Sequence, residues 1–220
     1  MNFEKFFLAA ILFTCPRSSF CQQATKVASI FNPQELFAQD LFTKNGNEFR
    51  PAYGAPGPTY WQNRANYILK SIIDTIAKLL TATETIQYTN NSPDALSSLW
   101  LQLDQNIYRE DARSNFYSSN SLRSKSTGGE HTDGYQFDEV TIEYKGKIVK
   151  ADYIISDTRM QIRLTSELLT KEKINIHIQY HYTISGIFGG RTDYFETKNG
   201  KIYEIAQWYP RMCVYDDQQG

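Results

Sequence analysis

The clearest pattern in the chain is an alternation of apolar and polar residues over 174–184. Ile or Tyr stands at every even position of this run, and a polar residue stands at every odd position. Period two over eleven residues predicts a strand with one face in a core and the other in solvent. The run therefore indicates a half-buried strand of an antiparallel sheet.

Shorter alternating runs predict further strands over 99–103, 140–144 and 160–164. Turn signals separate them: Lys145-Gly146 follows one run, and Asn199-Gly200 predicts a tight hairpin turn farther on. Many short strands with turns between them are typical of an all-β domain. We therefore expect a mainly β fold, an antiparallel β-sandwich.

The segment 67–81 leaves two interpretations open. Apolar residues recur there at helical spacing, and the local pattern favours an amphipathic helix. The segment has no capping box, however, and it continues directly into the β-branched stretch 83–89. A β-hairpin is the alternative.

The first 21 residues have the features of a secretory signal peptide. Lys5 supplies a positive charge, 6–14 is a short apolar run, and the expected cleavage follows Cys21. A lipid anchor at Cys15 is a rival interpretation that the large Thr14 before it disfavours, and a buried core helix is another. We therefore expect a secreted or periplasmic protein, in which Cys213 is the one cysteine left, without an internal disulfide.

Residues 22–64 are expected to form an N-terminal extension, and 65–220 the β-sandwich domain. The extension has helix-start signals at Asn32 and Pro33, which predict a short helix over 31–42, and a Pro/Gly-rich connector over 50–58. Residues 114–134 are rich in Ser, Gly and Asn and predict a long mobile loop.

Composition and charge exclude two classes of protein. The chain has 23 Lys+Arg and 24 Asp+Glu, a net charge of −1, which argues against a general nucleic-acid binder. No interior stretch reaches the roughly 18 apolar residues that a membrane-spanning helix needs.

The residues that could carry chemistry form no catalytic set. H-E-x-x-H, the zinc motif of metallopeptidases, is absent. His177 and His181 share a face of the predicted strand, where they would stand about 13 Å apart, too far to share a zinc ion. Glu130, His131 and Asp133 make a polar cluster in the predicted loop that could bind a metal only weakly.

The other polar candidates have structural interpretations. Cys213 lies among apolar residues, so we expect a buried, unreactive thiol. The adjacent carboxylates of Glu110-Asp111 and of Asp216-Asp217 would face different directions in a strand and do not form an acid/base pair. No metal or cofactor site is expected in this chain.

Four phrases of the sequence resemble one protein family. They are YWQNRAN at 60–66, YTNNSPDALSSLWLQLD at 88–104, DTRMQIRL at 157–164 and TKNGKIYEIAQWYPRMCVYDD at 197–217. Together they resemble the N-terminal region of secreted bacterial zinc metallopeptidases of the membrane alanyl aminopeptidase (aminopeptidase N) family, which belongs to the gluzincins.

The resemblance implies a saddle-like N-terminal β-sandwich that precedes a thermolysin-like catalytic domain, and it favours the hairpin over 67–81. The family's zinc motif, its distant Glu ligand and its G-x-M-E-N segment are absent from this sequence. It therefore implies a fragment without activity of its own. Zinc and the peptide substrate would be bound with the missing catalytic domain, which would be the partner of this one.

The resemblance also implies two residues that line the substrate cleft. The stretch 206–210, AQWYP, is similar to a T-Q-x-E-P phrase whose Gln reaches the active site, and this match falls on Gln207. Tyr209 stands where many relatives have a carboxylate, and a phenol pairs only weakly with a free α-ammonium. The alternative function is a free-standing secreted binding module, in which aromatic residues would stack on a glycan or bind a protein. Tyr180 and Tyr182 are candidates for this role, but the alternation places both on the apolar face of the strand, which favours the core.

Overall fold

The computed structural model describes residues 46–114, 131–186 and 191–217. Within these residues the chain is built from antiparallel strands, and the mainly β prediction is confirmed. The predicted signal peptide, the helix over 31–42 and most of the loop over 114–134 lie outside the described residues. In the described part of the chain no helix has the length and apolarity needed to cross a membrane.

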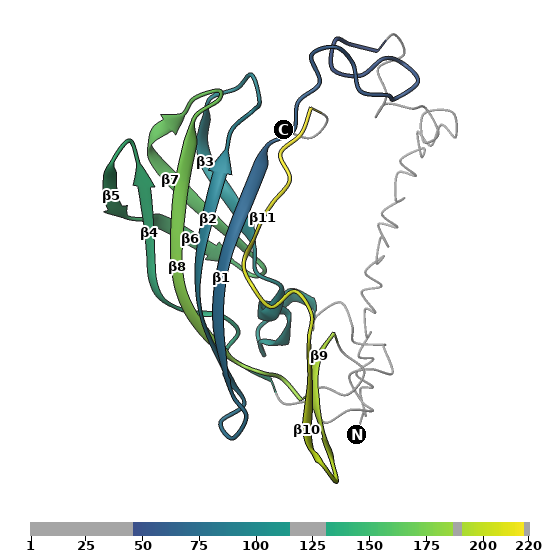
Figure 1. Cartoon of the computed structure of the whole chain (residues 1–220), viewed down its shortest axis with the longest axis vertical. Coiled ribbons are helices and arrows are strands. Elements are labelled where there is room, and N and C mark those ends of the chain that lie inside the picture. Colours follow the sequence, from purple (N-terminus) through teal and green to yellow (C-terminus); the bar gives the residue numbers. More distant parts are fainter. Residues whose placement is uncertain (1–45, 115–130, 187–190, 218–220) are drawn as a thin grey trace, which may run out of the picture. The chain divides into compact units, whose positions relative to one another are not determined.

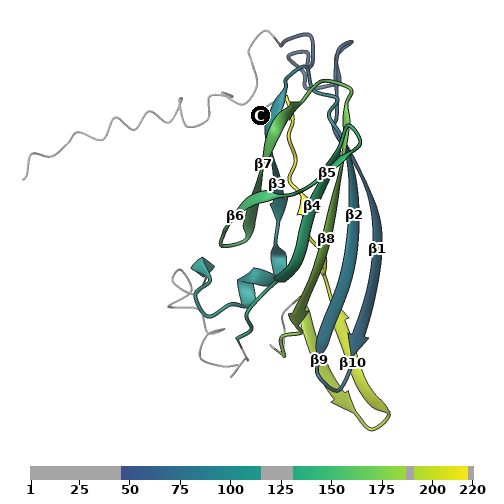
Figure 2. The ribbon, with the colours of Figure 1, turned by 90° about the vertical axis from the view of Figure 1, so that its left-hand side faces the viewer.

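Two sheets and one separate hairpin make up the β structure (Figures 1 and 2). The larger sheet has the order β1-β2-β8-β4-β5, formed by Arg64–Asp74, Leu79–Thr89, Lys173–Thr183, Gln136–Tyr144 and Lys147–Lys150. The smaller sheet has the order β11-β3-β7-β6, formed by Arg211–Met212, Leu96–Gln102, Arg159–Leu168 and Asp152–Ser156. Strands β9 (Thr192–Thr197) and β10 (Gly200–Ile205) form the hairpin, and a 3-10 helix, η1, spans Asp104–Tyr108.

The core lies between the two sheets. Strand β8 provides its centre, because its five inward residues from Ile174 to Tyr182 are buried, as is Ile184 directly after the strand. Opposite them, the smaller sheet contributes Leu99, Leu101, Met160 and Ile162. This arrangement, two layers around one apolar interior, is sandwich-like and confirms the strand predicted over 174–184.

The helix favoured by the local pattern over 67–81 is wrong, and the hairpin is present. Strands β1 and β2 pair without interruption from Arg64↔Thr89 to Asp74↔Leu79. Strand β2 also pairs along its whole length with β8, so its alternate residues are buried in the core. Ile72 and Ile76, which the helical pattern would bury, are 75% and 90% exposed. Tertiary pairing with β8 therefore outweighs the local helical spacing.

The two predicted turns are present with one shift in position. Lys145 and Gly146 connect β4 to β5, both with positive φ, as a two-residue hairpin turn requires. The other hairpin turns at Lys198 and Asn199, one residue earlier than predicted, and Gly200 with φ +120° opens β10. Glycine is needed there because other residues reach that backbone conformation only under strain.

The hairpin assignment predicts that two isoleucine substitutions differ strongly in how much stability they cost. Ile178→Ala removes a side chain that is 1% exposed on β8, and we expect it to lower the free energy of unfolding by about 2–4 kcal/mol. Ile72→Ala, the control on β1, should change it by less than about 0.5 kcal/mol. Urea unfolding of both variants measures the difference, and a large loss at Ile72 would contradict the hairpin.

Candidate functional site

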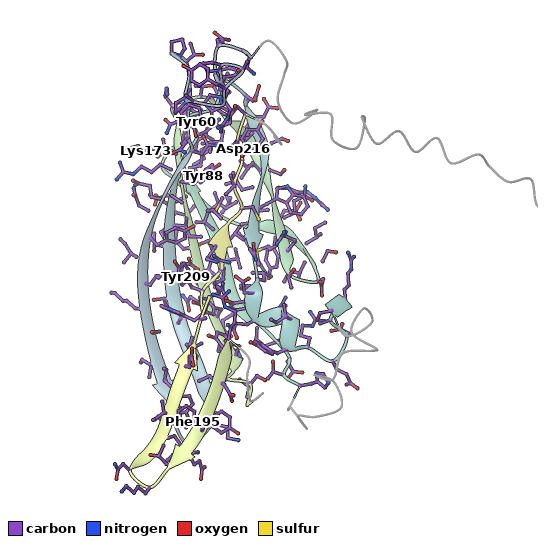
Figure 3. The ribbon with its side chains drawn as sticks, turned by 90° about the vertical axis from the view of Figure 1, so that its right-hand side faces the viewer. Tyr60, Tyr88, Lys173, Phe195, Tyr209 and Asp216 are labelled. Carbon is purple, nitrogen blue, oxygen red and sulfur yellow. The ribbon has the colours of Figure 1, made fainter. Side chains whose placement is uncertain are left out.

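One side of the domain carries the features that suggest a functional surface. The larger sheet ends there at β1 and the smaller sheet ends at β11. The segment 205–217 runs along this side, and Figure 3 looks directly at it, with Tyr60, Tyr88, Tyr209 and Asp216 labelled along its length. We call this surface, formed by 60–67, 88–94, 102–105 and 205–217, the seam.

The upper part of the seam surrounds a pocket of about 350 Å³. Trp61 stacks on Tyr215 with ring centroids 5.8 Å apart, and the Tyr215 hydroxyl donates to Asp94 at 2.9 Å. The Asn63 amide donates to the Tyr88 hydroxyl at 2.8 Å, and its oxygen accepts from the Asn91 backbone N–H at 2.6 Å. These contacts join segments from both ends of the described chain.

Burial raises the pKa of two tyrosines at this pocket. Burial raises the pKa of Tyr88 to about 12, and burial also raises the pKa of Tyr215. At the same pocket, Arg50 pairs with Asp217 at 2.6 Å and lowers the pKa of that carboxyl. The charged and phenolic groups of the upper seam are therefore suited to hydrogen bonding and packing.

The middle of the seam is aromatic. The rings of Tyr67 and Tyr209 meet edge to face at 5.5 Å, and Trp208 meets Tyr209 in the same way at 5.2 Å. The Met212 backbone N–H donates to the Tyr67 hydroxyl at 3.0 Å, which fixes β11 over β1. Tyr209 is thus half-buried packing between the two sheets.

The lower part of the seam holds Gln207 beside a second pocket of about 310 Å³. Gln207 has a left-handed backbone, with φ +48°, and its carbonyl accepts from the Gln105 side chain at 3.3 Å and from the Tyr135 hydroxyl at 3.4 Å. Arg211 and Asp104 pair across the same pocket at 2.6 Å.

Buried Gln105 is the anchor of this region. Its amide nitrogen also donates to the Thr192 hydroxyl at 3.1 Å and to the Ala206 carbonyl at 3.0 Å. One side chain therefore fixes the start of β9 and the end of β10 together. The sequence analysis missed Gln105, since no local pattern marks a side chain whose partners are about 90 to 100 residues away.

The two residues proposed from the resemblance lie in different parts of the seam. Gln207 lines the lower pocket, whereas Tyr209 belongs to the aromatic middle and lines neither pocket. Trp208 packs beside Tyr209 and is partly buried. The structure thus makes Gln207 accessible to a ligand in the pocket and gives Tyr209 a packing role.

A buried acid, Glu84, was also missed. It stands on β2 among core residues, is 2% exposed, and neither carboxyl oxygen has a hydrogen-bond partner among the described residues. Burial raises its pKa to about 9, so it is uncharged at neutral pH. The signal for it is the alternation Leu80, Ala82, Glu84, Ile86, which becomes visible only once this segment is read as a strand.

The phenols of Tyr180 and Tyr135 in the same core also have raised pKa values. Burial, followed by the charge that Glu84 would carry, raises the pKa of Tyr180. Tyr135, which packs edge to face against Tyr180 at 5.4 Å, also has a raised pKa because it is buried. Glu84 lines neither seam pocket, so we assign its effect to the stability of the core.

Among the described residues, the remaining candidates do not gather into a metal site. In the described ranges no three His, Cys, Asp or Glu side chains come together as metal ligands would. His177 contacts Thr85 and Glu143, while His181 contacts Asp138, so the two have separate partners. The cluster over 130–133 is described only in part: Glu130 lies outside the described residues, and His131 and Asp133 line a polar hollow.

The other residues singled out from the sequence have ordinary surroundings. Cys213 is half-buried at the edge of the upper pocket, where burial raises its thiol pKa. Asp111 forms an ion pair with Arg109 at 2.7 Å. Tyr180 and Tyr182 are buried in the core, as the alternation predicts, so they offer no stacking surface to a ligand.

A scan against protein-family models and a search of curated proteins found no match to this chain. The resemblance to the aminopeptidase N family therefore stays a prediction.

Glu84 gives a prediction for stability against pH. The folded state keeps the Glu84 proton up to a pKa of about 9, whereas the unfolded chain loses it near 4.5, so the free energy of unfolding should fall as pH rises between these values. The slope from this one group is at most about 1.4 kcal/mol per pH unit. Urea unfolding between pH 5 and 9 measures it.

The Glu84→Gln variant should remove that part of the slope, because an amide does not titrate. Glu204→Gln, at an exposed position of β10, is the matched control and should keep the wild-type slope. Equal slopes in wild type and Glu84→Gln would contradict a buried, protonated Glu84.

Proposed function

We propose that this chain is the N-terminal β-domain of a secreted zinc metallopeptidase of the aminopeptidase N type. In this role it closes one side of the substrate cleft and binds the catalytic domain through the seam. The zinc ion, its ligands and the general base would belong to that catalytic domain. Hydrolysis needs a zinc-bound water, so the β-domain by itself would be inactive.

The observation that carries the proposal is the convergence of the resembling phrases. Three of them, 60–66, 88–104 and 197–217, are separated by long stretches of chain, yet they meet in the seam through the Trp61–Tyr215 stack, the Asn63–Tyr88 hydrogen bond and the Arg211–Asp104 pair. The fourth adjoins them, because the Leu103 N–H donates to the Thr158 carbonyl at 2.9 Å. A likeness that gathers on one surface supports a shared role for that surface.

The lower pocket is the proposed contact with the substrate. Gln105 and Tyr135 hold the Gln207 carbonyl, so the position of the residue is fixed before a ligand arrives. From this fixed backbone position the side-chain amide of Gln207 can donate one hydrogen bond to the amino end of a peptide and accept another from it. This supports the substrate-lining role that the resemblance gives to Gln207.

Tyr209 modifies the proposed specificity. A carboxylate at this position would bind a free α-ammonium through a charge-assisted hydrogen bond. The phenol of Tyr209 instead packs against Tyr67 and Trp208. We therefore propose a peptidase in which the requirement for a free amino terminus is weaker than in relatives with the carboxylate.

Exposed apolar residues beside the seam support its role as a contact surface for another domain. Val214, two residues after the end of β11, is 84% exposed, and Trp100 on β3 is 42% exposed. Exposed apolar surface is one mark of a protein contact. We assign this contact to the catalytic domain.

The coding sequence past Gly220 gives the first test. An open frame that leads to H-E-x-x-H and a later Glu is the expected result. A stop codon directly after Gly220 would contradict the proposal and leave a binding domain without zinc. The isolated chain should also fail to release p-nitroaniline from amino-acid p-nitroanilides, with or without added zinc.

Gln207→Ala tests the role of the lower pocket in the complete enzyme. Loss of one hydrogen bond made in the transition state should lower kcat/KM about tenfold, with the melting temperature nearly unchanged. Gln179→Ala on the exposed face of β8 is the control and should leave turnover unchanged. Equal losses of stability and turnover in Gln207→Ala would make the residue structural.

The upper pocket favours a second candidate function, a free-standing binding module. Its lining combines the tyrosines Tyr60, Tyr67 and Tyr88 with polar groups such as Asn63, a combination that suits a small polar ligand with one apolar face, such as a sugar. Saturable quenching of Trp61 fluorescence by a glycan, abolished in Tyr88→Ala, would favour this function over the first.

A further inference from the structure

Strand β1 is an open edge of the larger sheet. In the described residues it pairs only with β2, so the N–H and C=O groups on its other side form no strand ladder. It runs for eleven residues without Pro, Gly or a register shift. Such an edge is a template for another strand.

The other three edges of the two main sheets are protected. Strand β5 has four residues and carries Lys147 and Lys150, β6 has five residues and begins with Asp152, and β11 has only two residues. Short, charged edges are the usual protection of sheets against unwanted pairing. Strand β1 has one central charge, Lys70, and exposes Ile68 and Ile72, at 64% and 75%. Among the described edges of the two main sheets, β1 is therefore the one without this protection.

We propose that β1 pairs antiparallel with β1 of a second copy of this chain, about a two-fold axis at Leu69. In this register Arg64 of each copy stands opposite Asp74 of the other, so the charged ends of the two strands are complementary. A two-fold interface repeats each such contact twice. The inference does not depend on the proposed function.

The other residues of the strand suit the same register. On the core side, Leu69 meets its own counterpart and Ala65 meets Ile73. On the outer side, Lys70 stands opposite Ile68, whose side chain covers the lysine stem. A register moved by two residues in one direction would instead place Lys70 opposite Lys70, and like charges directly opposite are destabilising.

The dimer would join the two larger sheets into one. An eleven-residue strand spans about 37 Å at 3.4 Å per residue, and antiparallel pairing satisfies the backbone groups along that length. Strand β1 lies at one side of the view in Figure 3, with the 205–217 segment running beside it. The two-fold contact uses the outer edge of β1.

Sedimentation equilibrium of the full chain at 1–200 µM tests the proposal. We expect a monomer–dimer equilibrium. Ile68→Lys places a lysine opposite Lys70 of the second copy and should raise the dimer Kd at least tenfold. Ile148→Lys, on the β5 edge with a similar exposure of 67%, is the matched control and should leave the Kd unchanged.

Three results would overturn the proposal. They are a chain that stays monomeric at 200 µM, equal effects of the two lysine variants, and a dimer that Ile68→Lys leaves intact. Circular dichroism checks that each variant keeps its β structure. A monomer whose β1 amides exchange quickly with solvent would mean that β1 is left unpaired, or is reserved for a strand outside this chain.

A cross-link tests the register. In a chain with Cys15, Cys21 and Cys213 replaced by Ser, Leu69→Cys should form a disulfide-linked dimer on mild oxidation, because opposite Cα atoms in an antiparallel pair lie about 4.5–5.5 Å apart. Ser71→Cys is the control: the two copies of residue 71 would be about 13 Å apart and should stay reduced. Linkage through residue 71 in place of 69 would overturn the register.

Discussion

The fold depends on strand β8, which pairs with β2 on one side and with β4 on the other. It is the central strand of the larger sheet, and its buried face runs unbroken from Ile174 to Ile184. Because the period of a strand is two, a slip of one residue would turn this entire apolar face to solvent. The register of β8 therefore fixes the registers of β2 and β4, and through β2 that of β1.

Two polar side chains, Glu84 and Gln105, are buried inside this framework. Glu84 is buried beside Tyr180 and stays protonated at neutral pH, while Gln105 uses its buried amide to anchor the β9–β10 hairpin. The two residues differ in how much their burial lowers the stability of the fold. Gln105 is satisfied by hydrogen bonds, whereas both oxygens of Glu84 are without partners in the described residues, so Glu84 costs stability when it ionises.

The seam and the β1 edge are neighbouring surfaces with different properties. The seam is held by side-chain contacts such as Arg211–Asp104 and Trp61–Tyr215, and its pockets suit the binding of another domain or of a ligand. The β1 edge offers backbone groups over eleven residues and suits another strand. The proposed contact with a catalytic domain uses side chains of the seam and the proposed contact with a second copy uses the main chain of β1, and the two surfaces share residues 64–67.

The sequence by itself determined the mainly β fold, strand β8 and the turn at Lys145-Gly146, because alternation and turn residues are local signals. It could not decide between helix and hairpin over 67–81, since the spacing of Leu69, Ile72 and Ile73 suits a helix in isolation. Only pairing of β2 with β8 settled that choice. The buried state of Glu84, the anchor at Gln105 and the convergence of 60–66 with 205–217 also required the tertiary structure, because each depends on partners far away in sequence.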